Sequence, residues 1–477
     1  MTWPHRRRGV GWVVVLGAME AGCARHAAAP ADASPVYAYA IAPPAEGSWR
    51  LSIDATFERA PSARLVAPEA HGALGDVTLA PGTAGGITPD GPNGEGWQIP
   101  ACQTRCVVHY VVDLDALASS CHRMDCGRRV GDSVLGLASS WMLRPEPAGD
   151  AVFRVRVAGG SPERFATGLR RDPAGGFVLR ARELGEAAFT AFGSLRRDVV
   201  DVPGAKLEVA LLGPPLKMGD PATLGWVKGA ADCVSGLFGH FPVDATVFVV
   251  PVKGADEVVF GRVMSLAGAS VALLFGDQAR ADHAHEDWVV VHEFFHLGCP
   301  SFVGEGHWLE EGLATYYEPL LRERAGWLTE TDLWTHFASN MPRGVRADGE
   351  PASIEDRDDI DSTYWGGALF ALLADVGIRE ATGNARSLDD AMRAVLQREG
   401  DATKQARVAD FVRTADEATG SHVVADLYRT WAMLGQNADL DGLLRRLGVR
   451  AKDGKVTLEE KAPLAAIRRA MASGGHH

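Results

Sequence analysis

The sequence predicts a multi-domain protein with an N-terminal β-sandwich-like domain, a central α/β domain and an all-helical C-terminal lobe. A chain of 477 residues is too long to fold around one simple hydrophobic core, so we expect two or three domains. Short strand-like segments dominate as far as Pro203, and helical spacing of apolar residues dominates from Asp282 onward. We expect the β-domain at 49–204, the α/β domain at 205–350 and the helical lobe at 351–477.

The first residues have the layout of an export signal, predicted over 1–22. Three arginines at 6–8 precede a short apolar stretch at 9–19, too short to span a bilayer. Ala21-Gly22-Cys23 resembles the end of a bacterial lipoprotein signal, although Glu20 stands where a leucine-like residue is usual. Two outcomes stay open: a lipid anchor on Cys23, or cleavage near 27–29. In both we expect an exported protein, in the periplasm, in the outer membrane or on the cell surface.

The next two stretches predict a linker and then strands. Residues 23–48 are rich in Ala and Pro without a periodic apolar pattern, which is typical of a linker. The segments 107–114, 152–157 and 177–181 are short, rich in β-branched and aromatic residues, and separated by Gly/Pro turns. They predict the strands of the β-domain.

The central and C-terminal parts have a different pattern. Residues 207–212 and 245–252 predict buried strands, and 263–275 is apolar but fits either type of element. Apolar residues recur at helical spacing over 387–397, 408–419 and 464–472, with charged residues between them. These three segments predict helices.

The formal net charge of -13 limits the class of partner. A protein that binds nucleic acid needs a clustered positive surface, so we expect no nucleic-acid partner. The sequence leaves the oligomeric state open.

The cysteines fit an oxidising compartment. Six of the seven cysteines remain after Cys23, and an even number in an exported protein favours disulfides. Four of them lie close together in the sequence: Cys102, Cys106, Cys121 and Cys126. The gaps between these four do not match the paired two-residue spacing of zinc modules, so disulfides are favoured over a structural zinc site. For Cys299 we expect a disulfide, with Cys233 as the candidate partner.

The segment from His292 to His296, HEFFH, carries the strongest chemical signal. The run 284–297 has no helix breaker, and Gly298 then ends it. Residues four apart share a helix face, so His292 and His296 present two imidazoles to one point, as a zinc ion requires. Glu293 lies about 100° round the helix, where it can take a proton from water.

A catalytic zinc site needs a third protein ligand and one open position. The pattern HExxHxxGxxH fails, because Cys299 and Phe302 occupy the positions of its glycine and third histidine. The other well-known pattern places a glutamate on a following helix. The segment 308–317, WLEEGLATYY, offers Glu310 and Glu311.

This segment resembles the WxxEGxAxY element of gluzincin peptidases, and the nearest similarity is to the glycyl-aminopeptidase-like family of metallopeptidases. The resemblance implies a thermolysin-like α/β zinc-peptidase domain that holds one Zn²⁺ per chain. It implies Glu311, directly before Gly312, as the third ligand, with Glu310 beside the site. It covers about 292–471, since the segments 320–327, 364–369, 377–379 and 387–393 also look like the family's, in order.

Two further positions bear on activity. Tyr364 begins a YxxGA element, and in gluzincins this tyrosine stabilises the oxyanion of the tetrahedral intermediate; the alternative is a packed aromatic at a helix start. In related aminopeptidases a glutamate on a strand edge binds the free amino group of the substrate. The corresponding residues, 261–268, include no acid, so aminopeptidase and endopeptidase activity both stay open.

We therefore expect an exported zinc metallopeptidase that hydrolyses peptides or proteins with a zinc-activated water and Glu293 as general base. The alternative is a non-catalytic surface lipoprotein that binds zinc structurally or binds a partner protein. The presence of Glu293 favours the enzyme, because a structural site needs no base.

Overall fold

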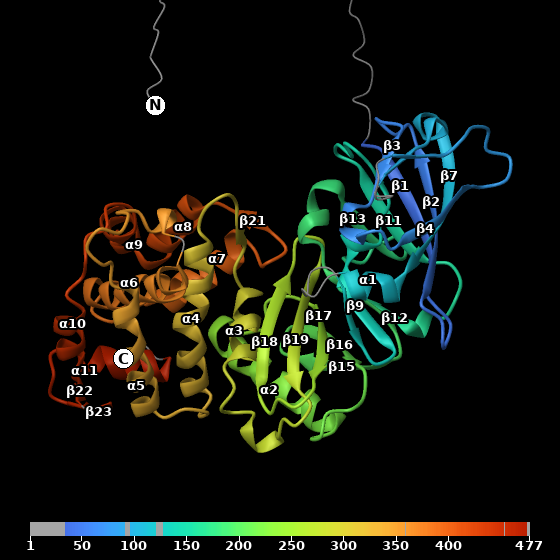
Figure 1. Ribbon diagram of the computed structural model, residues 1–477. Coiled ribbons are helices and arrows are strands. Elements are labelled where there is room, and N and C mark those ends of the chain that lie inside the picture. Colours follow the sequence, from blue (N-terminus) through green and yellow to red (C-terminus); the bar gives the residue numbers. More distant parts are fainter. Residues whose placement is uncertain (1–33, 91–95, 121–126, 358, 453, 475–477) are drawn as a thin grey trace, which may run out of the picture. The chain divides into compact units, whose positions relative to one another are not determined.

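The computed structural model describes residues 34–90, 96–120, 127–357, 359–452 and 454–474 (Figure 1). The predicted signal peptide, Cys23, Cys121 and Cys126 lie outside these ranges. Residues 35–477 form one compact unit, to which the description below applies. Within the described ranges, no helix is both long and apolar enough to cross a bilayer.

Three sheets make up the N-terminal part of this unit. Strands such as β2 alternate buried and more exposed side chains, so Leu51, Ile53 and Phe57 face a core of their own. The first sheet has the order β13-β11-β1-β2-β7-β4, the second β10-β3-β6-β5 and the third β12-β14-β9-β8. Their bounds are β1 Val36–Ala42, β2 Arg50–Glu58, β3 Arg64–Val66, β4 Leu74–Leu79, β5 Thr88–Asp90, β6 Gly96–Gln98, β7 Arg105–Asp113, β8 Arg128–Val130, β9 Ser133–Leu137, β10 Arg144–Pro145, β11 Val152–Val157, β12 Phe165–Thr167, β13 Phe177–Arg180 and β14 Phe189–Gly193.

A five-stranded sheet forms the centre of the molecule, in the order β15-β16-β17-β19-β18. β16, β17 and β19 are parallel, while β15 and β18 pair antiparallel at the two edges. The helix α2, Asp220–Phe238, connects β16 to β17. The strands are β15 Leu195–Val202, β16 Ala205–Leu212, β17 Ala245–Val252, β18 Val258–Met264 and β19 Ala269–Gly276.

The central parallel strands β17 and β19 are buried on both faces, as is typical of parallel sheets. Along β17, Val247 and Val249 face the core shared with the helices, and Phe248 and Val250 face β9 and β14 of the third N-terminal sheet. The backbone N–H of Phe189 donates to the Ser270 hydroxyl across that second contact, at 2.9 Å.

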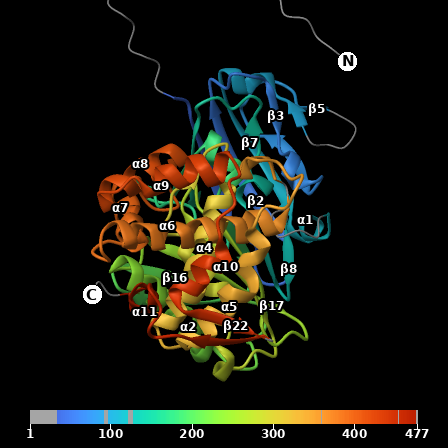
Figure 2. The ribbon, with the colours of Figure 1, turned by 90° about the vertical axis from the view of Figure 1, so that its left-hand side faces the viewer.

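Helices dominate after β19 (Figures 1 and 2). They share one apolar core with the central sheet, which runs from Val200 to Ala472. The bounds are α3 Val289–His296, α4 His307–Arg324, α5 Glu330–Asn340, α6 Gly367–Ala381, α7 Leu388–Arg398, α8 Val408–Thr419, α9 Val423–Leu427, α10 Leu440–Leu447 and α11 Ala465–Ser473, with α1 at Leu114–Ser120 in the N-terminal part.

Three expectations about organisation need correction. The predicted linker contains β1, where Tyr37, Tyr39 and Ile41 are buried in the first sheet. The boundary between 204 and 205 falls inside the β15–β16 hairpin, so one sheet spans it. The C-terminal lobe is not all-helical, because β22 Val449–Lys452 pairs with β23 Lys455–Leu458, and β21 Gln405–Ala406 pairs with β20 Ser301–Phe302.

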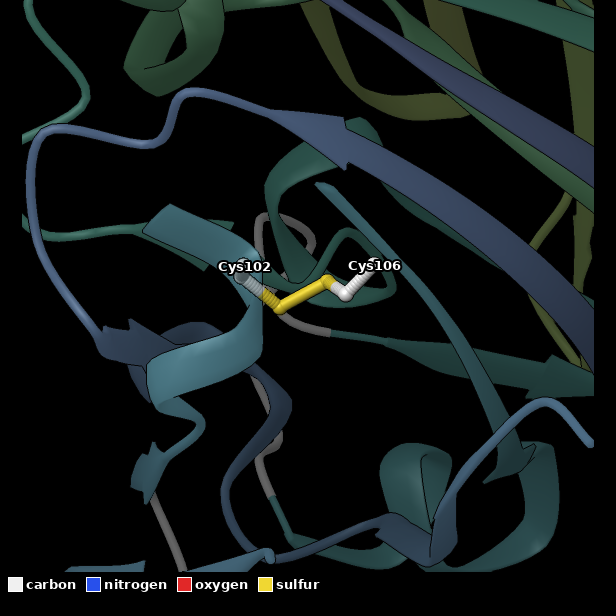
Figure 3. Close-up of a disulfide and its surroundings, with 2 residues drawn as sticks. All are labelled: Cys102 and Cys106. Carbon is white, nitrogen blue, oxygen red and sulfur yellow. A yellow bond between two sulfur atoms is a disulfide. The ribbon is translucent and has the colours of Figure 1, made fainter. Parts of the chain in front are cut away.

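The described cysteines divide into one disulfide and two thiols. Cys102 and Cys106 are bonded, with their Cα atoms 4.6 Å apart, as Figure 3 shows. Cys233 and Cys299 are free and buried in the core shared by the sheet and helices, so the expected disulfide between them is wrong. Burial raises the pKa of the Cys233 thiol to about 12, so it behaves as a small apolar side chain.

Candidate metal centre

The helix that carries both histidines begins next to an aspartate. The Asp287 carboxylate accepts the backbone N–H groups of Val289 at 3.2 Å and Val290 at 3.3 Å, two of the donors that a helix start leaves unpaired. The expected helix over 284–297 is therefore shorter in the structure, where α3 covers Val289–His296. His292 and His296 lie on one of its faces, with ring centroids 4.9 Å apart.

Two glycines bring the next part of the site close. A Cβ atom on Gly312 would lie 2.2 Å from the Cα of Gly367, and one on Gly367 would lie 2.0 Å from the carbonyl oxygen of Trp308. These positions therefore exclude any larger residue, and α4 packs directly against the start of α6. The contact places Glu311 of α4 near Tyr364, which belongs to the helical turn Asp361–Gly366 before α6.

The two imidazoles and one carboxylate converge. The Nε2 atom of His292 lies 3.2 Å from Oε2 of Glu311, and Nε2 of His296 lies 3.6 Å from the same oxygen. One ligand atom from each of the three residues lies within 4.8 Å of the others. A tetrahedral zinc ion with bonds of about 2.0–2.2 Å separates neighbouring ligand atoms by about 3.3–3.5 Å. The three residues therefore fit one zinc ion.

The charges at this point favour a cation. Burial raises the pKa of Glu311, but the two imidazoles, His296 first, outweigh it and hold that pKa well below its usual range. Burial lowers the pKa of His296, but the carboxylate of Glu311 outweighs this and raises it to about 9. For His292 burial dominates and lowers the pKa. A positive charge placed between the two imidazoles and the carboxylate stabilises this cluster. A bound metal ion would supply that charge when both histidines are neutral.

Glu293 lies beside this group, on the side of the edge strand β18. Burial raises the pKa of its carboxyl group to about 7, against the lowering effects of His296, Arg262 and the Val263 backbone amide. A general base works best when its pKa lies near the working pH, so this carboxylate suits proton transfer at neutral pH.

Tyr364 packs against one of the two histidines. Its ring is stacked on that of His292, with centroids 6.1 Å apart and 16° between the planes. Burial raises the pKa of its hydroxyl, and the negative charge of Glu311 raises it further. The group therefore stays protonated at neutral pH and can donate a hydrogen bond.

Glu310, the alternative to Glu311, points to a different partner. Its carboxylate accepts the backbone N–H of Phe302 at 2.5 Å, and it is not in the group of three that could hold a metal. Burial raises its pKa. Glu310 therefore fixes the backbone between α3 and α4 and is not placed as a metal ligand.

One cleft of about 840 Å³ is lined by the three candidate ligands and by Glu293, Glu310 and Tyr364. Among the carboxylates in its wall that sequence reasoning missed is Glu355. It accepts the backbone N–H of Gly306 at 3.2 Å and Nε1–H of Trp308 at 2.5 Å. Its position 47 residues beyond Trp308 gives no local pattern from which to predict the contact.

The fold has known relatives among solved structures, although no family model and no curated protein matches the sequence. An aminopeptidase N family protein from Idiomarina loihiensis matches with a TM-score of 0.65 and 16% identity, over 90% of this chain and 82% of that one. An M1 zinc metallopeptidase from Deinococcus radiodurans matches with a TM-score of 0.50 and 16% identity, over 85% of this chain and 95% of that one.

The chain therefore has the multi-domain α/β fold of the M1 zinc metallopeptidases, with sheets followed by a largely helical C-terminal part. This confirms the predicted multi-domain α/β fold with a largely helical C-terminal part. The narrower similarity to glycyl aminopeptidases and the boundary between residues 350 and 351 stay predictions.

Proposed function

We propose that this protein is a zinc-dependent peptidase that hydrolyses peptide bonds in the cleft beside α3 and α4. One observation carries the proposal: His292, His296 and Glu311 converge to within 4.8 Å of one another, and Glu293 and Tyr364 line the same cleft without belonging to that group. The fold shared with an M1 zinc metallopeptidase and an aminopeptidase N family protein supports a peptide as substrate.

Each residue has a distinct role. A zinc ion held by the three ligands would polarise the scissile carbonyl and lower the pKa of water. Glu293 takes the proton from the attacking water and later delivers it to the leaving amine. The Tyr364 hydroxyl donates a hydrogen bond to the carbonyl oxygen as negative charge develops there.

The alternative, a structural zinc site in a non-catalytic lipoprotein, fits the geometry less well. Structural zinc sites are normally closed by four protein ligands. Only three residues converge here among those the structure describes, and they line an open cleft. A fourth position is therefore left for water or substrate.

The test is a digest of a peptide library by the zinc-loaded protein and its Glu293→Gln variant. We expect cleavage by the wild type, none after chelation, and at least 10³-fold lower turnover in the variant, with zinc content and thermal stability unchanged. Absence of cleavage by the wild type would favour the structural-zinc alternative. Near-normal turnover in Glu293→Gln would contradict the mechanism.

We also propose that the protein is exported. The arginines and apolar stretch at 6–19 and the Cys102–Cys106 disulfide support this, because disulfides persist in oxidising compartments. Mass spectrometry of the N-terminus of the mature protein, from fractionated cells, tests it and distinguishes lipid on Cys23 from cleavage near 27–29. An intact N-terminus in the cytoplasmic fraction would contradict it.

A further inference from the structure

The cleft exposes apolar side chains around the metal position. Val259 and Phe260 of β18 are 42% and 48% exposed, Trp288 before α3 is 51% exposed and Val303 after β20 is 53% exposed, and all four line the cleft. Large apolar groups normally stay out of water, so a cluster of them in a cleft marks a binding surface. Apolar parts of a substrate can therefore contact β18, the residue before α3 and the segment after β20.

The same strand carries one positive charge. β18 is an edge strand with the sequence VVFGRVM, and Arg262 is its only ionisable residue. Of the described residues that line the cleft, Arg262 is the one lysine or arginine. Its side chain is exposed, and no carboxylate of the described chain lies within ion-pair distance of it.

The acidic residues of the cleft differ from Arg262 in this respect. Glu310 and Glu355 already accept hydrogen bonds from backbone N–H groups, and Glu311 faces the two histidines. Glu186 and Glu305 are exposed at the rim, where water screens their charge. Glu293 also lines the cleft, but its side chain packs against Gly261 and it is less exposed than Arg262. The exposed charge that β18 itself presents to a substrate is therefore positive, which attracts a carboxylate and repels an ammonium group.

We propose that Arg262 binds a carboxylate of the substrate, so that the cleft selects peptides with an acidic group beside β18 and apolar residues around it. This inference rests on the proposed peptidase function and adds the class of substrate. An acidic side chain and a C-terminal carboxylate share this chemistry. A free amino terminus does not, so the amine of the substrate has no binding group on this strand.

The test uses matched peptides that carry Glu or Gln at one position, moved through the three positions on each side of the scissile bond. All are N-acetylated and C-amidated, and a second set has free termini. At one of these positions we expect kcat/KM to be about fivefold to tenfold higher for the Glu peptide than for the matched Gln peptide. A ratio of this size is what a charge-assisted hydrogen bond contributes in a partly solvated cleft. Dependence on the free C-terminus would identify the terminal carboxylate as the source.

Two variants and one control separate the contributions. Arg262→Gln should bring the Glu/Gln ratio close to one, and Arg262→Glu should bring it below one. Lys253→Gln removes an exposed charge from the turn before β18 without touching the cleft, and should keep the ratio. The Kd values of the same peptides for zinc-loaded Glu293→Gln, with and without Arg262→Gln, give the ratio without turnover.

The outcomes are distinguishable. A Glu/Gln ratio near one in the wild type, a ratio that survives Arg262→Gln, or a requirement for a free amino terminus would overturn the assignment of Arg262. If the wild type cleaves no peptide at all, the proposed function fails, and the ratio of Kd values alone then decides for or against carboxylate binding by Arg262.

Discussion

A Cβ atom on Gly261 would lie 2.3 Å from Cγ of Glu293. The edge strand β18 therefore passes directly against the side chain of the proposed general base, and only glycine allows this approach. Val263, two residues further along the strand, also acts on Glu293, because its backbone amide lowers the pKa of the carboxyl group. The position of Glu293 is thus set by β18 as well as by α3.

Gly261→Ala should displace the Glu293 side chain while leaving the three metal ligands in place. We expect turnover to fall by about 10²-fold, since small errors in the placement of a catalytic group are costly, with zinc content unchanged. Steady-state kinetics and elemental analysis check this. Gly225→Ala is a matched control on α2, where a Cβ atom meets nothing within 4 Å. Full activity in Gly261→Ala would show that the strand does not position the base.

Glu311→Gln should strip zinc from the protein, whereas Glu310→Gln should leave the zinc content near one per chain. The reason is that Oε2 of Glu311 lies 3.2 Å from Nε2 of His292, while Glu310 accepts the Phe302 backbone N–H instead. Elemental analysis after dialysis against a weak chelator measures the difference. The reverse ranking would make Glu310 the third ligand.

The sequence predicted those parts of the site that depend on local geometry. His292 and His296 lie four residues apart, so a helix alone places them on one face. Glu311 needed the resemblance to a known element, because its contact with His292 joins two helices. The contact of Gly261 with Glu293 joins a strand and a helix 32 residues apart, and a single sequence has no pattern that reports it.

The errors in the fold have equally specific causes. Val36–Ala42 has the sequence VYAYAIA, in which two tyrosines and an isoleucine alternate, but the surrounding Ala and Pro suggested a linker. β22 and β23 pair with each other, and the sequence between them reads Asp-Gly, a known turn signal, yet strands of four residues each are too short to show a period. The even number of cysteines suggested a disulfide between Cys233 and Cys299, but each is a free thiol packed in the apolar core.

Tyr364→Phe should lower kcat by about 10²-fold with little change in KM, because the hydroxyl matters most when charge develops on the carbonyl oxygen. Since the charge of Glu311 acts on this hydroxyl, the zinc content of the variant must be measured alongside its kinetics. Tyr428→Phe, outside the lining of the cleft, serves as control. A rise in KM with kcat unchanged would assign Tyr364 to substrate binding alone.

Glu323→Gln should stabilise the protein at pH 8 but not at pH 5. Burial, followed by the charge of Glu330, raises the pKa of Glu323 from its usual 4.5 to about 7, and its Oε2 atom is buried without a hydrogen-bond partner in the described chain. The folded state therefore binds this proton more tightly than the unfolded state does. The associated stability is fully present below about pH 4.5 and is lost as the pH rises through about 7.

Glutamine carries no charge at either pH, so the apparent Tm should rise by about 1–2 °C at pH 8 and stay nearly equal at pH 5. Thermal unfolding followed by circular dichroism checks this, with the exposed Glu257→Gln as control. An identical shift of Tm at both pH values would show that the charge of Glu323 is not what destabilises the fold.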